Sequence, residues 1–383
     1  MDASHVANSS DSSILSLFRA HGELSRTDVI EKSGLSRSTI NQRLTELAES
    51  GLIVPTVGGE STGGRPSSRF RFNAERASIL SVDIGATAFI IAVCDLDGTP
   101  RQSTRTLIEV WSGPDEVLAA VEKAISTLNL DGEIWAISVG VPGPVEFAAR
   151  RVVKPPIMTG WDGFDIVAWF GERFDAPVLV ENDANARAMA EARTRGVDNL
   201  VSLKLGTGIG AGLVFNGSII RGDKGAAGDI GHTRALISQL DGHVCRCGNV
   251  DCVESYAGGW AVQRDLELAG ITVKSLQDVV ALVRRGDMHT VQIVRGAGRV
   301  IGDAIADLVS ILNPGTIVLT GQMADCGEVL MSGIRERVYQ HTVPLATTDL
   351  RIINSELGDL GGVTGLAMLA ADGLFNPTNP ISV

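Results

Sequence analysis

Aromatic residues make up only 4% of the 383 positions, and long apolar runs are missing altogether. A transmembrane helix needs about 18 or more consecutive apolar residues, so a membrane-spanning protein is not expected. The N-terminus, MDASHVANSSDSS, has neither the basic stretch nor the apolar core of a signal peptide. We therefore expect a cytoplasmic protein without a membrane partner, in which structural disulfides are rare.

Positive charge is also scarce, because 33 lysines and arginines face 45 aspartates and glutamates, for a net charge of −12. This balance argues against nucleic-acid binding by the surface as a whole. The deficit is uneven: residues 1–76 carry nine basic and nine acidic side chains, whereas the remainder carries 24 and 36. Residues 34–71 contain five arginines against three glutamates. A nucleic-acid site is therefore expected only in this N-terminal segment.

The N-terminal segment has the pattern of short helices joined by a tight turn. Residues 12–20 are apolar at helical spacing, and residues 25–33 predict a helix that Ser25 caps. Residues 36–50 predict a further helix, with Ser36 as its cap and a single apolar face, which Gly51 ends. Together these signals predict a helix-turn-helix, and the strand-like runs LIVPTV and RFRFN that follow predict a wing.

The outer face of helix 36–50 is polar and basic, as suits contacts with base edges and phosphates. The candidate DNA contacts on it are Arg37, Ser38, Thr39, Asn41, Gln42 and Arg43. The segment GGESTGGRPSS between the wing strands contains Arg65. Arg65 is a candidate minor-groove contact, because an extended arginine is favoured in a minor groove. The alternatives are a helical hairpin with a solvated polar face and a plain loop around Arg65.

From residue 77 onward, one strand-and-turn design occurs twice. Residues 79–108 predict a strand that ends at Asp83, a turn that contains Gly85, and two more strands. Residues 200–220 repeat the design around the glycine-rich turn GTGIGAG. This repeat predicts two similar α/β lobes that face a cleft. Glycine-rich turns of this kind leave backbone N–H groups free to bind phosphate.

Between the two repeats, the apolar run PVLV leads into a polar cluster. The run is followed by Glu181, Asn182 and Asp183, and a helix is expected to start near Asn185. Ligands of α/β proteins bind at the carboxyl ends of strands. Asp183 is therefore a candidate general base for a sugar hydroxyl. The alternative is that Asp183 only caps the helix.

Three of the five cysteines lie within the segment HVCRCGNVDCVE, residues 243–254. Their spacing supplies three thiolates, and tetrahedral Zn²⁺ requires a fourth ligand. The remaining two, Cys94 and Cys326, lie far away in the sequence and are expected to be buried apolar side chains.

These motifs together resemble the ROK family (repressor, ORF, kinase), which has the sugar-kinase and actin-like fold. The resemblance covers almost the whole chain and rests on DIGAT (83–87), GVPGP (140–144), ENDANARAMAE (181–191), GTGIGAG (206–212), GDIGH (228–232) and CRCGNVDCVE (245–254). The N-terminal segment is similar to the repressor branch. The implied fold class is α/β: a winged helix-turn-helix and linker over residues 1–76, and a two-lobed, ribonuclease H-like body over residues 77–383.

The resemblance also implies residue roles. The sugar site would consist of Asn182, Asp183, Asp229, His232 and Glu254. In a kinase, the phosphates of ATP and their metal would meet Asp83, Gly85, Thr87, Gly206, Thr207 and Gly208. The zinc would be a structural clip near residues 232–252, bound by His232, Cys245, Cys247 and Cys252, with His243 as the alternative to His232.

Several positions depart from the pattern of the family's kinases. Ala86 and Ala88 stand where a glycine and a lysine are usual, and the sequence Thr320-Gly321-Gln322 replaces three glycines. Because the Cβ of Ala86 crowds the backbone where a phosphate would approach, these changes argue against ATP and Mg²⁺ as cofactors. Ile157 stands where sugar kinases often have an asparagine, so the sugar pocket is expected to be altered.

We therefore expect a sugar-responsive transcriptional regulator, a repressor, with operator DNA and a monosaccharide or sugar derivative as its partners. A homodimer or homotetramer is expected, because two-fold assembly matches a pseudo-palindromic operator. The alternative is an ATP-dependent sugar kinase that uses Asp183 as its base.

Overall fold

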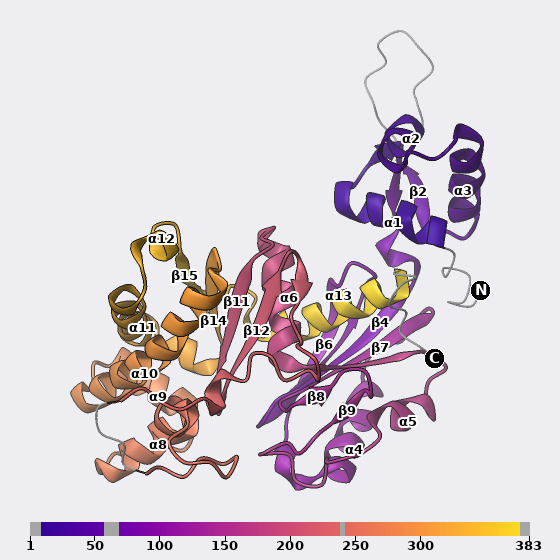
Figure 1. Cartoon of the computed structure of the whole chain (residues 1–383). Coiled ribbons are helices and arrows are strands. Elements are labelled where there is room, and N and C mark those ends of the chain that lie inside the picture. The colour runs from indigo at the N-terminus through magenta and orange to yellow at the C-terminus, as the bar shows by residue number, and fades with distance from the viewer. Residues whose placement is uncertain (1–8, 57–68, 238–241, 376–383) are drawn as a thin grey trace.

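A computed structural model of the chain describes residues 9–56, 69–237 and 242–375. Its N-terminal unit combines helices with a small antiparallel sheet in the order β1-β3-β2 (Figure 1). The elements are α1 (Ser9–His21), β1 (Leu24–Ser25), α2 (Arg26–Ser33), α3 (Arg37–Glu49), β2 (Ile53–Thr56) and β3 (Arg69–Phe72). The predicted helices and both wing strands are confirmed, and β1 is an addition that the sequence did not indicate.

Capping side chains set the helix boundaries in this unit. The hydroxyl of Ser25 accepts a hydrogen bond from the backbone N–H of Asp28, whose carboxylate accepts one from the backbone N–H of Ser25, at 2.8 Å. The hydroxyl of Ser36 caps α3 by accepting a hydrogen bond from the backbone N–H of Thr39 at 3.2 Å. The left-handed φ of 76° at Gly51 requires a residue without a Cβ just after α3. The predicted helix-turn-helix is therefore present.

The first lobe of the body is built on a mixed sheet in the order β10-β7-β4-β5-β6. Strands β4, β7 and β10 run parallel, and β5 and β6 extend the sheet as antiparallel hairpins. The strands are β4 (Ser78–Ile84), β5 (Ala88–Cys94), β6 (Pro100–Leu107), β7 (Ile134–Val141) and β10 (Val178–Asn182). One face packs on α4 (Pro114–Ile125) and α5 (Ile166–Gly171), and a small hairpin joins β8 (Val145–Glu146) to β9 (Arg151–Val152).

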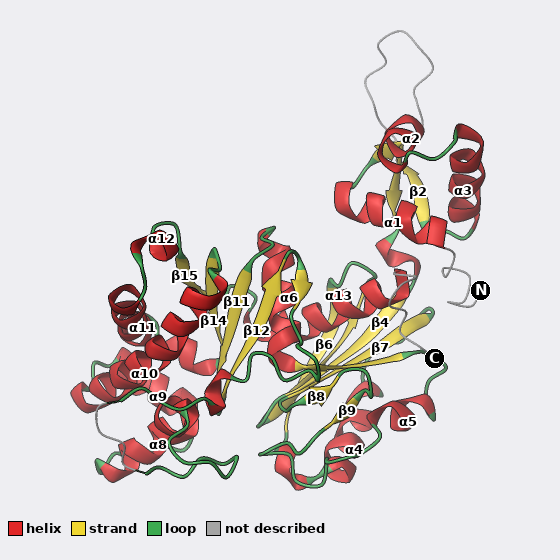
Figure 2. Ribbon diagram, viewed as in Figure 1, coloured by secondary structure: helices red, strands yellow, loops and turns green. Residues whose placement is uncertain are grey.

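The second lobe has a sheet of the same design, in the order β13-β12-β11-β14-β15, as the sequence repeat predicts. Its strands are β11 (Leu200–Leu205), β12 (Ile209–Phe215), β13 (Ser218–Ile219), β14 (Thr316–Thr320) and β15 (Arg351–Asn354). The outer face is covered by helices, shown in red in Figure 2: α7 (Val253–Ala257), α8 (Gly259–Leu268), α9 (Leu276–Arg284), α10 (Met288–Leu312), α11 (Glu328–His341) and α12 (Pro344–Thr347).

Two helices lie between the sheets and join the lobes. Helix α6 (Asp183–Arg195) covers β11 and β12, and α13 (Gly361–Phe375) covers β4 and β7 (Figure 1). The two helices pack closely against each other, because a Cβ on Gly365 would overlap the carbonyl oxygen of Ala186. Each helix begins near the cleft between the lobes, so both connect the cleft to the far end of the body.

The N-terminal unit rests on the end of α13. Buried side chains of α1 and β3, among them Ile14, Phe18 and Phe72, continue into a cluster with Phe375 of α13. The rings of Phe72 and Phe375 meet edge to face, with centroids 5.5 Å apart. The core of the N-terminal unit is thus continuous with that of the body. Within the described residues, no helix is long and apolar enough to cross a membrane.

Candidate functional site

A cavity of about 570 Å³ lies where the two lobes face each other. Asp83 lines it from the end of β4, Asn182 and Asp183 from the junction of β10 and α6, and residues 206–208 from the turn after β11. These segments come from both lobes, so only the folded chain brings them together. The predicted cleft is therefore present, and it is lined by every residue of the expected sugar and phosphate sites.

Asn182, and not Asp183, caps helix α6. The side-chain oxygen of Asn182 accepts hydrogen bonds from the backbone N–H groups of Ala184 and Asn185, and its amide donates to the carbonyl of Gly143 at 3.0 Å. The helix starts at Asp183, two residues before the predicted start at Asn185. The alternative interpretation of Asp183 as a helix cap is therefore wrong, because the capping position is already filled and Asp183 faces the cleft.

Asp183 is buried and forms an ion pair with Lys204 of β11. Burial raises the pKa of Asp183 above its ordinary value, the ammonium of Lys204 lowers it, and the nearby carboxylate of Asp83 raises it. A carboxylate in this setting remains a hydrogen-bond acceptor for a ligand hydroxyl. As a general base it would have to take up a proton next to a cation, which the ion pair opposes.

Asp83 is also paired with a cation of the chain itself. Its carboxylate accepts a hydrogen bond from Arg187 of α6 at 3.2 Å, and Arg187 also donates to the carbonyl of Gly358, at 3.2 Å. Gly362 lies directly against Asp83, where a Cβ would overlap the carboxylate. Asp83 thus already has a cation of the chain itself as its partner.

The predicted phosphate-binding residues Gly85, Thr87, Gly206, Thr207 and Gly208 all line the cavity. So do Ala86 and the segment 320–322, which replace the usual glycines. A Cβ at Gly206 would meet open space, whereas one at Gly208 would overlap the carboxylate of Glu254. The turn therefore keeps an open backbone at Gly206, while Asp83 is paired with Arg187 and side chains of Ala86, Thr320 and Gln322 line the cavity.

Glu254, His232 and Asp229 form the opposite wall of the cavity. The buried carboxylate of Glu254 accepts hydrogen bonds from the backbone N–H of Ile209 at 2.9 Å and from the indole of Trp260 at 3.2 Å. His232 Nε2 lies 3.9 Å from Asp229 Oδ1, and burial raises the pKa of Asp229. These groups offer acceptors and a donor to hydroxyl groups, as sugar recognition requires.

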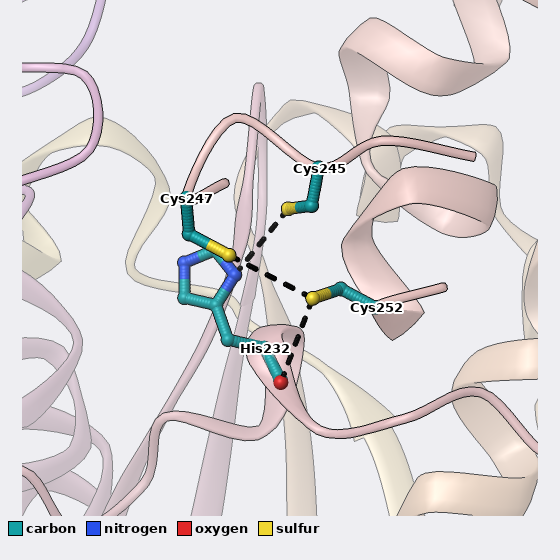
Figure 3. Close-up of side chains that lie close together, drawn as sticks. All are labelled: His232, Cys245, Cys247 and Cys252. Carbon is teal, nitrogen blue, oxygen red and sulfur yellow. Dashed lines mark hydrogen bonds between the residues drawn. The ribbon is translucent and has the colours of Figure 1, made fainter. Parts of the chain in front are cut away.

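His232, Cys245, Cys247 and Cys252 form a cluster that could hold a metal ion, with all ligand atoms within 4.8 Å of one another (Figure 3). His232 Nδ1 lies 3.5 Å from the sulfur of Cys245, and the sulfurs of Cys247 and Cys252 are 3.7 Å apart. Tetrahedral zinc with Zn–S of about 2.3 Å and Zn–N of about 2.0 Å places its ligands at about these separations. The cluster thus fits a closed, four-ligand zinc site.

The alternative ligand, His243, lies outside this cluster. Its ring stacks on Tyr256 with centroids 4.6 Å apart, and its backbone N–H donates to Asp251. The structure therefore favours the set with His232. All five cysteines are free, and Cys94 and Cys326 are buried among apolar side chains, as predicted. Burial raises the pKa of both thiols to about 12.

The candidate DNA-binding residues of α3 differ in their solvent exposure. Arg37, Ser38 and Gln42 are exposed, and Thr39 and Asn41 are half-buried. Arg43 instead binds inward, with its guanidinium 2.9 Å from Glu46 and 3.5 Å from the buried Asp11. Arg65 lies outside the described residues.

None of the cations that line the cavity was among the predicted site residues, and two of them, Lys204 and Arg187, pair with the predicted carboxylates. One signal for Lys204 was available, since it is the only charged residue in the apolar strand LVSLKL. Arg187 gave a weaker signal, because it follows Asp183 by four residues and shares its helix face. Neither signal identified a partner, because the partners lie on other elements or at a helix end.

Residues 79–373 match the family model of the ROK family, and residues 8–54 match that of winged helix-turn-helix DNA-binding domains. The chain therefore belongs to the ROK family. It is similar to the xylose repressor of Bacillus spizizenii, with 26% identity over 91% of this chain and 91% of that protein.

Solved structures agree with this assignment. A ROK family transcriptional regulator, a homolog of the Escherichia coli MLC protein, superimposes with a TM-score of 0.80 and 25% identity over 97% of this chain and 98% of its own. A ROK family glucokinase from Streptomyces griseus, solved with glucose and AMPPNP, matches with a TM-score of 0.67 and 27% identity, over 76% of this chain and 99% of its own.

Proposed function

We propose that this protein is a sugar-responsive transcriptional repressor. It binds operator DNA through the winged helix-turn-helix and a sugar in the cleft between the lobes. The observation that carries this proposal is that one chain combines a winged helix-turn-helix with a two-lobed body. The similar regulator covers 97% of this chain, whereas the glucokinase covers 76%. Similarity to a xylose repressor over 91% of both chains supports the same role.

In this proposal, α3 enters the major groove, and Arg37, Ser38, Asn41 and Gln42 are its main contacts. Arg43 supports the helix from within, through Asp11 and Glu46. The domain division at residues 76 and 77 belongs to the same proposal. So does assembly as a homodimer or homotetramer, since two-fold symmetry would present a pair of winged helices to an operator.

The ligand in this proposal is a monosaccharide or a sugar derivative. Asp183, Asp229, His232 and Glu254 would bind its hydroxyls, and Asn182 would hold the start of α6 in place. Zn²⁺ would be the metal of the clip and have a structural role, because its four ligands leave no open position for chemistry. Ile157 also lines the cavity, which supports a pocket that differs from that of the kinases.

The direct test combines DNA selection with a sugar screen. Fragments selected from a random DNA pool by the full-length protein are titrated by fluorescence anisotropy, with and without each sugar. A sugar that raises the thermal midpoint and changes DNA affinity supports the proposal, since a ligand that binds only the native state stabilises it. Failure to select any DNA sequence would refute it.

Kinase activity is the weaker candidate. Asp183 lies in the cleft, but it is paired with Lys204, and Asp83 is paired with Arg187. Incubation with ATP, Mg²⁺ and a sugar panel should therefore yield no ADP above background. Turnover that is lost in Asp183→Ala would instead establish a kinase.

A further inference from the structure

Lys204 occupies an unusual place for a lysine. It lies on β11, and its backbone pairs with Gly210 on one neighbouring strand and Thr320 on the other, so the residue is interior to the sheet. Strand alternation turns Leu203 and Leu205 into the core beneath the outer helices. Lys204 points to the opposite face, which α6 covers, and there it meets Asp183.

The two members of this ion pair differ in their access to the cleft. The side chain of Lys204 is 23% exposed and lines the cavity, whereas that of Asp183 is only 5% exposed. The side chain of Lys204 is thus more accessible from the cleft than that of Asp183.

The chemistry of the pair suits a ligand rich in hydroxyl groups. An ammonium has three N–H donors, and Asp183 occupies one of them. Asp183 keeps acceptor capacity, so a donor and an acceptor stand side by side on the cleft wall. The neighbouring pair of Asp83 and Arg187 brings the four side chains to zero net charge. A neutral ligand can thus bind without a balancing metal ion.

We propose that Lys204 is a specificity-determining residue of the effector site. Its ammonium donates to one sugar oxygen while Asp183 accepts from the adjacent hydroxyl, so the pair recognises two neighbouring oxygens. The ligand class is a neutral monosaccharide or derivative with two adjacent free hydroxyl groups. This inference rests on the proposed function, namely that the cleft binds a sugar.

Calorimetric titration of the full-length protein with glucose, xylose and their monodeoxy derivatives tests the inference. In Lys204→Met, the Kd of the sugar that the wild type binds should rise about 10- to 100-fold, as for the loss of a hydrogen bond from a charged donor. Lys204→Gln should lose less sugar affinity than Lys204→Met, because the glutamine amide can still donate a hydrogen bond. Lys123→Met, on the exposed surface of α4, is the matched control and should bind like the wild type.

The deoxy sugars separate a contact with the ligand from a structural role. Wild-type protein should discriminate against the sugar that lacks the hydroxyl contacted by Lys204, and Lys204→Met should lose that discrimination. Equal sugar affinity and equal discrimination in both proteins would overturn the inference while leaving the proposed function intact. If the wild type binds none of the sugars in the screen described above, the proposed function fails and the inference fails with it. Should Lys204→Met not fold, Lys204→Leu carries the same comparison, because it also lacks a donor.

Discussion

Asp372 of α13 forms an ion pair with Arg19 of α1, with 3.2 Å between the guanidinium and the carboxylate. The second oxygen of Asp372 binds Arg193, near the end of α6. One carboxylate thus joins the winged-helix unit to both helices that pass between the lobes. Those helices begin at the cleft, α6 with Asp183 and α13 near Asp83. A shift of either helix by a bound ligand would therefore reach the winged helix through Asp372.

We predict that Asp372→Asn uncouples the two binding events. Coupling between sites is typically about 5- to 150-fold in affinity. In the variant, the ratio of DNA affinities with and without saturating sugar should approach one. DNA affinity and sugar affinity, each measured separately, should stay within about 3-fold of the wild type. Fluorescence anisotropy with and without sugar measures the change.

Glu336→Gln is the matched control for this prediction. Glu336 of α11 also binds two arginines, Arg295 and Arg299, but both of these lie on α10, away from the winged helix. It should leave the response to sugar unchanged. A wild-type response in Asp372→Asn would show that the signal takes another route.

Close packing of α6 on α13 predicts a sharp difference between two glycines. Gly365→Ala places a methyl group on the carbonyl of Ala186, so it should destabilise the fold by about 1–3 kcal/mol. Gly296→Ala, in α10, meets open space and should stabilise it by about 0.5–1 kcal/mol through helix propensity. Denaturant titration measures both, and equal effects would contradict the packing described.

Two arginines of α3 should behave differently when replaced by alanine. Arg37→Ala should weaken DNA binding and reduce the slope of log affinity against log salt by about 1, because one phosphate contact is lost. Arg43→Ala should mainly lower the thermal midpoint, since it leaves the buried Asp11 without its cation. An unchanged salt slope in Arg37→Ala would remove this residue from the interface.

Metal content distinguishes the two histidines near the clip. Protein with His232→Ala should lose most of its bound zinc, whereas His243→Ala should retain about one equivalent, because only His232 lies with the three cysteines. His243→Ala should still lower the thermal midpoint through its lost stacking on Tyr256. Elemental analysis of the purified proteins measures the zinc content. Loss of zinc in His243→Ala but not in His232→Ala would make His243 the fourth ligand.

Sugar affinity should depend on pH through Asp183, whose pKa burial raises above 3.8. The ionised carboxylate is the acceptor, so affinity should be full at neutral pH and fall as the pH drops through the raised pKa. Lys204 lowers this pKa, so in Lys204→Met the fall should begin at higher pH. The charged groups around Asp183 are Lys204, Arg187 and Asp83.

The effect of Asp183 on folding has the opposite sign. Because the folded-state pKa is raised, the contribution of this group to stability is fully present below 3.8 and is lost as the pH rises through the folded-state pKa.

The sugar affinity itself is measured by calorimetric titration over a pH series. In Asp183→Asn, the fall in sugar affinity at low pH should disappear. A fall that persists in this variant would implicate another group.

Local patterns predicted much of the fold. Ser25 and Ser36 mark their helices because a cap depends only on the few residues that follow it. The strand-and-turn repeat predicted both lobes for a similar reason, since alternation and glycine turns are local signals. The start of α6 was misplaced by two residues, because Asn182 and Asp183 are both plausible caps and only the direction of each side chain separates them.

The sequence by itself determined the family, the helix-turn-helix, the two lobes and the set of three clustered cysteines. The tertiary structure decided which cations meet which carboxylates: Lys204 with Asp183, Arg187 with Asp83, and Arg43 with Asp11. It also separated His232 from His243 as the fourth member of the cysteine cluster. The physical reason is that a side chain's charge and type are local properties, whereas its partner depends on how strands and helices distant in sequence pack together.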